Sequence, residues 1–141
     1  MTSLSFPDIN VWLAVAAPEH VHHSAAGSWW ERETRRIGFC RITQLGLLRL
    51  MTTAAAMDGK PLTMVEAWRV HDRLFEDDRV TFVTEPAAVE KHFREYASGG
   101  AASPKLWADA WLLAFADAVG GAVVTFDRAL AARSERCVLL S

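Results

Sequence analysis

The stretch SPKLWADAWLLAFADAVGGAVVTFD, residues 103–127, combines the signature of a helix with that of a buried strand. Its Ser-Pro start is typical of a helix N-terminus, because a hydroxyl can cap free backbone N–H groups and proline fits the first turn. The Gly-Gly pair is typical of a helix C-terminus, so we predict a helix over residues 103–119. The apolar run AVVT follows at once. A helix that leads directly into a buried strand is one unit of an α/β fold.

The rest of the chain alternates apolar runs with helical patterns in the same way. The predicted strands are residues 4–7, 37–42, 80–83, 122–125 and 137–140. The predicted helices are residues 11–17, 21–34, 44–53 with Thr43 as N-cap, 63–75 with a Thr63–Glu66 capping box, 85–96, 103–119 and 127–132. Strands that are apolar throughout and alternate with helices predict a mainly parallel sheet covered by helices on both faces.

The composition is that of one globular domain. The chain has 141 residues, of which 51% are hydrophobic and 23% charged, which excludes global disorder. No apolar run approaches the roughly 20 residues of a membrane-spanning helix. The first ten residues lack the regions of a secretory signal, and Cys40 and Cys137 lack the spacing of a disulfide scaffold or a zinc site. We therefore expect a cytoplasmic protein with no membrane segment.

The formal charge of −2 is distributed unevenly along the sequence. Residues 31–60 contain six basic and three acidic residues, whereas residues 61–100 sum to −3. The basic segment is either a solvated face or a local binding surface for phosphates. The net charge argues against a protein that holds nucleic acid by bulk positive potential, but not against one that cuts it.

Three aspartates are placed to reach the crevice at the carboxyl ends of the predicted strands. Asp8 follows the first strand, Asp127 follows the strand at 122–125, and Asp109 lies early in the helix at 103–119. Singly, Asp8 and Asp127 can be helix N-caps and Asp109 an exposed helix charge. Together, converging carboxylates repel one another unless a cation binds between them. Oxygen ligands favour Mg²⁺ or Mn²⁺, and a metal held in this way can activate water for phosphodiester hydrolysis.

Four blocks of the sequence together resemble PIN-domain nucleases, specifically the VapC-type toxin ribonucleases of bacterial toxin–antitoxin pairs. The blocks are FPDINVWLAV (6–15), CRITQLGLLRLMT (40–52), LWADAWLLAFA (106–116) and VVTFDRAL (123–130). The resemblance implies one PIN domain over residues 1–141, a three-layer α/β/α fold with about four or five strands. It also implies a catalytic Mg²⁺ or Mn²⁺ site at Asp8, Asp109 and Asp127, an RNA substrate, a homodimer and a VapB-like antitoxin.

The family pattern extends to neighbouring polar residues. Asn10 matches an Asn two residues after the first acid, and Thr125 matches a hydroxyl residue just before the last acid. The usual fourth acid, a Glu in the third helix, is replaced by Gln44, or by Arg49 in an alternative alignment. We expect Gln44 and Thr43 to line the pocket, with weaker metal affinity for want of one charge. The expected RNA-phosphate ligands are Arg41, Arg49 and Arg128.

Two other functions remain open from the sequence. One is a PIN-fold binding module that lost catalysis together with its fourth acid. Another is a phosphatase on a parallel sheet, in which Asp8 would be covalently phosphorylated. Mn²⁺-dependent RNA cleavage that disappears in Asp8→Ala separates the nuclease from both.

Overall fold

A computed structural model describes residues 4–141, so part of the stretch considered as a secretory signal lies outside the described residues. Five strands form one sheet in the order β3-β2-β1-β4-β5, and every strand pair is parallel. The predicted parallel sheet is therefore confirmed. The strands are β1 (Leu4–Pro7), β2 (Arg36–Phe39), β3 (Val80–Phe82), β4 (Ala122–Thr125) and β5 (Val138–Leu139).

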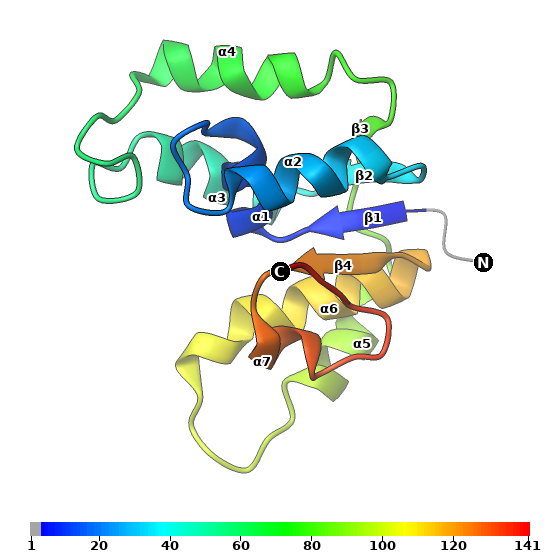
Figure 1. The fold of residues 1–141 in the computed structure, drawn as a ribbon. Helices are drawn as coiled ribbons and strands as arrows, with labels where there is room; N and C mark the ends of the chain where they lie inside the picture. The colour runs from blue at the N-terminus through cyan, green and yellow to red at the C-terminus, as the bar shows by residue number, and fades with distance from the viewer. Residues whose placement is uncertain (1–3) are drawn as a thin grey trace.

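Helices cover both faces of this sheet, which confirms the three-layer prediction. In Figure 1, α1 to α4 lie in the upper part of the molecule and α5 to α7 lie below β4. The helices are α1 (Ile9–Ala16), α2 (His23–Arg32), α3 (Arg41–Met51), α4 (Met64–Leu74), α5 (Val89–Tyr96), α6 (Trp107–Val119) and α7 (Arg128–Ala131), with a 3₁₀ turn, η1 (Pro104–Leu106), before α6. No helix of these described residues is both long and apolar enough to cross a bilayer.

Two buried clusters account for this layering. Val124 of β4 packs with Trp12 of α1 and Leu47 of α3. The neighbouring Val123 packs on the opposite face with Phe6 and with Phe115 of α6. Successive residues of a strand point to opposite faces, so one short apolar run serves both cores. This is why the strands read as continuous apolar runs in the sequence.

Three predicted helix starts are wrong, although the helices themselves exist. The strand predicted over 37–42 ends at Phe39, and α3 begins at Arg41 with Cys40 as its N-cap. Thr43 is therefore not the N-cap: it lies one turn inside, where its hydroxyl accepts the Cys40 N–H at 3.1 Å. The Ser103 side chain makes no capping bond, because η1 precedes α6, which begins at Trp107. The helix predicted from residue 85 begins at Val89, after a turn.

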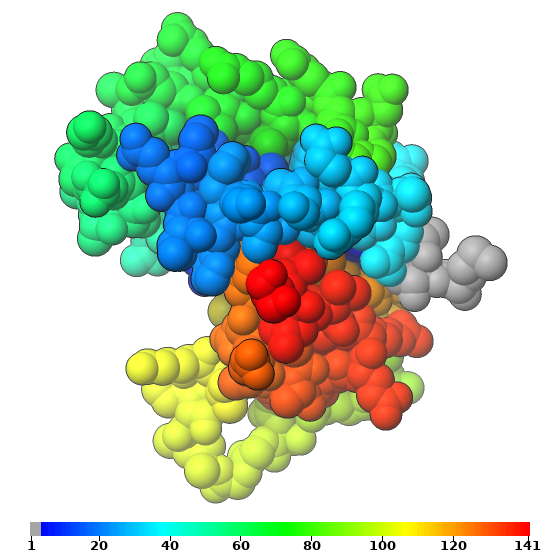
Figure 2. Space-filling model, in the orientation of Figure 1, coloured from blue at the N-terminus to red at the C-terminus, as the bar shows by residue number. Residues whose placement is uncertain are grey.

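The helices predicted from residues 11 and 21 begin at Ile9 and His23, each two residues from the predicted start. Two other predicted boundaries are confirmed. Thr63 and Glu66 form the reciprocal capping box at the start of α4. Gly120 ends α6 in the left-handed conformation, with φ 71°, which a residue without Cβ adopts at little cost. Figure 2 shows the segment between α5 and α6 projecting from the molecule, in yellow at the lower left.

Glu33, just after α2, connects β1 with the start of β2. The Ser5 hydroxyl donates to Glu33 Oε2 at 2.7 Å, and Arg35 Nε donates to Glu33 Oε1 at 3.1 Å. Burial tends to raise the pKa of Glu33, but these hydrogen bonds outweigh it and lower the pKa to about 2. The ionised carboxylate is therefore favoured in the folded state.

We expect Glu33→Gln to lower the free energy of unfolding at neutral pH. Because the folded pKa lies below the ordinary value of 4.5, the contribution of Glu33 is complete above pH 4.5 and is lost as the pH falls towards 2. Urea unfolding at pH 7 and at pH 3 measures this, with Glu31→Gln, an exposed neighbour, as control. A difference between wild type and Glu33→Gln that grows on acidification would contradict the assignment.

Candidate active site

The carboxyl ends of β1 and β4 meet at one edge of the sheet, where Asp8 and Asp127 follow the two strands. The Asp8 N–H donates to the Val124 carbonyl at 2.9 Å, so strand pairing continues up to the first acid. Asp109 is the third residue of α6, which packs against β4. The sheet thus brings together acids from both ends of the chain and from its last long helix.

Asp8 is held by two hydrogen bonds. Its Oδ1 accepts the Val11 N–H at 3.0 Å, which makes Asp8 the N-cap of α1. Its Oδ2 accepts a hydrogen bond from the Thr125 hydroxyl, and the Thr125 Oγ1 in turn accepts the Asp127 N–H at 2.9 Å. Asp127 caps α7 through the N–H groups of Ala129 and Leu130. The capping role considered from the sequence is therefore real for both, and it fixes their carboxylates in place.

The three acids form a concentration of negative charge. Burial has the largest effect on the pKa of Asp8 and raises it, and the charges of Asp109 and Asp127 also raise it. Hydrogen bonds from Thr125 and Val11 lower the pKa, but the net shift is upward. Burial and Asp127 also raise the pKa of Asp109, against the opposing charge of Arg133. Within residues 4–141, none of the three carboxylates takes part in a salt bridge. Converging carboxylates that have no salt-bridge partner favour the binding of a cation, because it would relieve their mutual repulsion.

The donors fit a hydrated divalent ion. Across the part of the chain described, no three His, Cys, Asp or Glu side chains are arranged to ligate one metal directly. Mg²⁺ usually keeps several waters and binds through only one or two carboxylates, so it does not need three direct ligands from the protein. All the donors are oxygens, from the acids and the Thr125 hydroxyl, which favours Mg²⁺ or Mn²⁺ over softer metals.

Gln44, predicted to line this pocket, lies in a different network. Arg41 Nη1 donates to Gln44 Oε1, and Gln44 Nε2 lies 3.2 Å from Nε2 of the buried His71. Neither of these hydrogen-bond partners of Gln44 is one of the three aspartates. Thr43, the other predicted polar group, uses its hydroxyl on Cys40. His71 was not predicted as a site residue, although its place four residues after the buried Ala67 on α4 is a signal that it faces inward.

Gly46 of α3 lies close against Ile9, the first residue of α1. A Cβ there would lie 2.2 Å from Ile9 Cδ1, directly after the first acid. Asn10 is exposed on the first turn of α1.

Two of the three predicted phosphate ligands lie at the strand edge. Arg41 begins α3 just after β2 and lies over the Phe82 ring, 4.7 Å from its centroid. Arg128 is exposed and directly follows Asp127. Arg49 is exposed near the other end of α3, eight residues after Arg41 or about 12 Å along the helix. Arg41 and Arg128 therefore flank the acids, whereas Arg49 is more distant.

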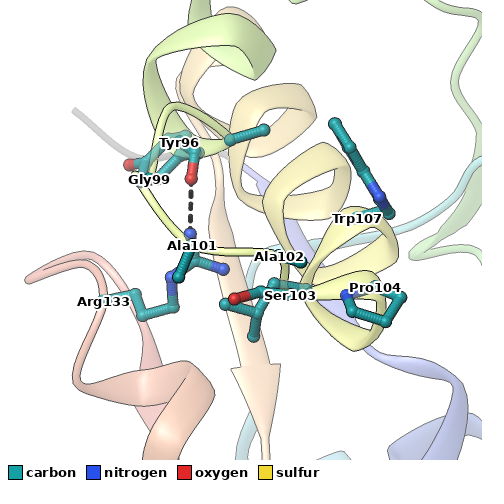
Figure 3. A pocket seen from close by; sticks show the side chains of 10 residues that line it. Tyr96, Gly99, Ala101, Ala102, Ser103, Pro104, Trp107 and Arg133 are labelled. Atoms are coloured by element: carbon teal, nitrogen blue, oxygen red, sulfur yellow. Dashed lines mark hydrogen bonds between the residues drawn. The ribbon is translucent and has the colours of Figure 1, made fainter.

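Arg133 was not identified from the sequence, which offers no local signal for it. It lines a cavity of about 460 Å³ below the segment between α5 and α6, and its Nη2 donates to the Tyr96 carbonyl at 2.6 Å. Figure 3 shows this bond beside Ala101, with Trp107 at the start of α6. Arg133 thereby ties the C-terminal end of α5 to the segment after α7.

Comparison with known proteins gives a consistent match. The PIN domain pattern matches residues 5–135. Ribonuclease VapC41 of Mycobacterium tuberculosis is 41% identical over 128 residues, which cover 86% of this chain and 88% of the relative. Ribonuclease VapC44 of the same organism is 32% identical over 130 residues, covering 88% and 86%. The crystal structure of M. tuberculosis VapC20, a sarcin–ricin loop cleaving toxin, has the same fold, with a TM-score of 0.67 at 16% identity over 91% of this chain and 93% of that chain.

Proposed function

This chain belongs to the PIN-domain family, and on that premise we propose that it is the toxin of a VapBC-type toxin–antitoxin pair, a metal-dependent endoribonuclease. The observation that carries the proposal is the convergence of Asp8, Asp109 and Asp127 at one strand edge, without a salt bridge among the described residues. The names of the similar relatives, which are ribonucleases, support the same activity. The proposed domain spans residues 1–141.

The chain's own residues have distinct tasks in hydrolysis. Asp8 presents its carboxylate at an orientation fixed by the Val11 N–H and the Thr125 hydroxyl. Asp109 and Asp127 add negative charge to the cluster. Arg41 and Arg128 flank the acids and are suited to contact the RNA on either side of the scissile bond. A bound Mg²⁺ or Mn²⁺ would supply the charge that activates water and stabilises the pentavalent phosphorus.

The same proposal includes three binding partners and a location. The partners are an RNA substrate, a VapB-like antitoxin and a second copy of the chain. The proposed location is the cytoplasm. An antitoxin that inserts an Arg among the acids would inhibit by replacing the charge of the cation.

We expect cleavage of structured RNA with Mn²⁺ or Mg²⁺ and none with a chelator. Asp109→Asn removes one charge from the cluster and is expected to lower kcat/KM by roughly 10²-fold or more. The control is Asp78→Asn, which removes an exposed acid after α4 and should cleave like wild type. Gel-resolved initial rates measure both. Cleavage that persists in chelator, or that is indifferent to Asp109→Asn, would contradict the metal-dependent mechanism, and RNA binding without cleavage would favour the binding-module alternative.

A further inference from the structure

A second cavity of about 350 Å³ opens at the same edge of the sheet as the acids. It is lined by the first residues of α3, by the segment that follows β3, and by one face of α6. Neighbouring strands lie about 4.8 Å apart, so the residues after β3 are about 10 Å from those after β1, the scale of one to three nucleotides. An RNA whose phosphate is at Asp8 therefore reaches this cavity with a nearby base.

The walls of the cavity suit the flat faces of a base. Phe82, Trp111 and Phe115 line it, and the Trp111 and Phe115 ring centroids are 5.1 Å apart. Phe82 and Trp111 are only partly buried. The Arg41 guanidinium covers one face of the Phe82 ring, so a ligand can reach Trp111 and the remaining surface of Phe82. Aromatic side chains bind unpaired bases by stacking, whereas a phosphate gains nothing from apolar walls.

One cationic and one anionic side chain, Arg41 and Glu85, lie at the rim of the cavity. Arg41 is exposed. Its Nη1 donates to Gln44, which leaves Nε and Nη2 available to donate to a ligand. Glu85 is exposed and lines the same cavity. Arg donates to the O6 and N7 acceptors of guanine, and a carboxylate accepts from ring and amino N–H groups. Guanine is the RNA base that offers a pair of acceptors, O6 and N7, next to a pair of donors, N1–H and N2–H₂.

We propose that this cavity is a guanine subsite of the RNA-cleaving centre, with Arg41 and Glu85 at the edge of the base and Trp111 and Phe82 against its faces. The inference rests on the proposed function and deepens it, because it names the feature of the RNA that selects where the chain cuts. Adenine lacks the O6 acceptor and the N1–H donor, and the pyrimidines offer less surface for stacking.

The test uses the full chain and four single-stranded RNA pentamers that differ only in the central base. In chelator, fluorescence anisotropy is expected to show the guanine pentamer binding at least about fivefold more tightly than the adenine one, as a bidentate base contact implies. Glu85→Gln should remove most of that preference, and Trp111→Leu should weaken all four pentamers. Glu90→Gln is the matched control, since this exposed acid of α5 pairs with Arg94 outside the cavity and should keep the preference.

Cleavage mapping on a long RNA in Mn²⁺ separates this proposal from the one on which it rests. Cuts that lie at a fixed distance from guanines in wild type and scatter in Glu85→Gln support the subsite. Identical cut positions in both proteins would overturn the subsite while leaving the nuclease proposal intact. A guanine preference that Glu85→Gln removes, in a chain that cuts no RNA, would support the subsite and contradict the nuclease. Because Glu85 is exposed, its replacement should leave the melting temperature unchanged.

Discussion

Asp8→Asn is expected to reduce RNA cleavage on the order of 10³-fold, the largest effect of any single substitution at the site. The amide has nearly the shape of the carboxylate and can still accept the Val11 N–H, so the change removes charge and leaves the cap of α1 in place. Initial rates at saturating Mn²⁺ measure the loss. An Asp8→Asn protein that cuts RNA at more than about a tenth of the wild-type rate would remove Asp8 from the proposed mechanism.

The same variant, although it is expected to lose activity, should not lose thermal stability in the absence of metal. Burial, together with Asp109 and Asp127, raises the pKa of Asp8 above 3.8 despite its hydrogen bonds. The ionised side chain therefore costs stability, a cost absent below pH 3.8 and complete above the raised pKa. In chelator at pH 7, Asp8→Asn should melt no lower than wild type. Excess Mn²⁺ should raise the melting temperature of wild type and of Asp78→Asn, but not that of Asp8→Asn.

Trp12→Ala is expected to lower the free energy of unfolding by about 3–5 kcal/mol. Trp12 has no exposed surface; its ring stacks on Phe39 with centroids 3.6 Å apart and meets Trp30 edge-on at 5.9 Å. Truncation leaves a large cavity between α1, α2 and the sheet. Urea unfolding followed by circular dichroism measures the loss.

Trp12→Phe provides the matched control. The Trp12 Nε1 is buried without a hydrogen-bond partner among the described residues, so the indole N–H is a cost that phenylalanine removes. The smaller ring still fills most of the space, and the expected loss is below about 1.5 kcal/mol. Equal losses in the two variants would show that the aromatic packing of Trp12 does not stabilise the fold.

The sheet and the positions of the acids were predictable because both depend on local patterns. A buried parallel strand is a short apolar run, and an acid directly after it must lie at the carboxyl edge whatever the rest of the chain does. Asp8 and Asp127 satisfy this rule without further information. The helix starts were less predictable, because Cys40 is not a usual N-cap and a 3₁₀ turn takes the place of the expected cap at Ser103.

Features that depend on distant residues were not predictable from spacing. The side chain of Gln44 meets His71, 27 residues later in the sequence, and no pattern near Gln44 reports that partner. The cavity at Arg41, Glu85 and Trp111 likewise combines three segments that only the sheet order brings together. The sequence therefore indicates the kind of chemistry, whereas specificity depends on tertiary packing.

The pairing of β4 with β1 has a consequence for how the protein is made. Asp8 emerges from the ribosome before most of this domain, whereas Asp127 and the strand that positions it emerge only after the helices that lie between them in the sequence. A nascent or prematurely terminated chain that stops before residue 122 has neither the complete set of acids nor the hydroxyl of Thr125 that orients them. Such chains are expected to cleave no RNA, so activity can start only after β4 and Asp127 have been synthesised.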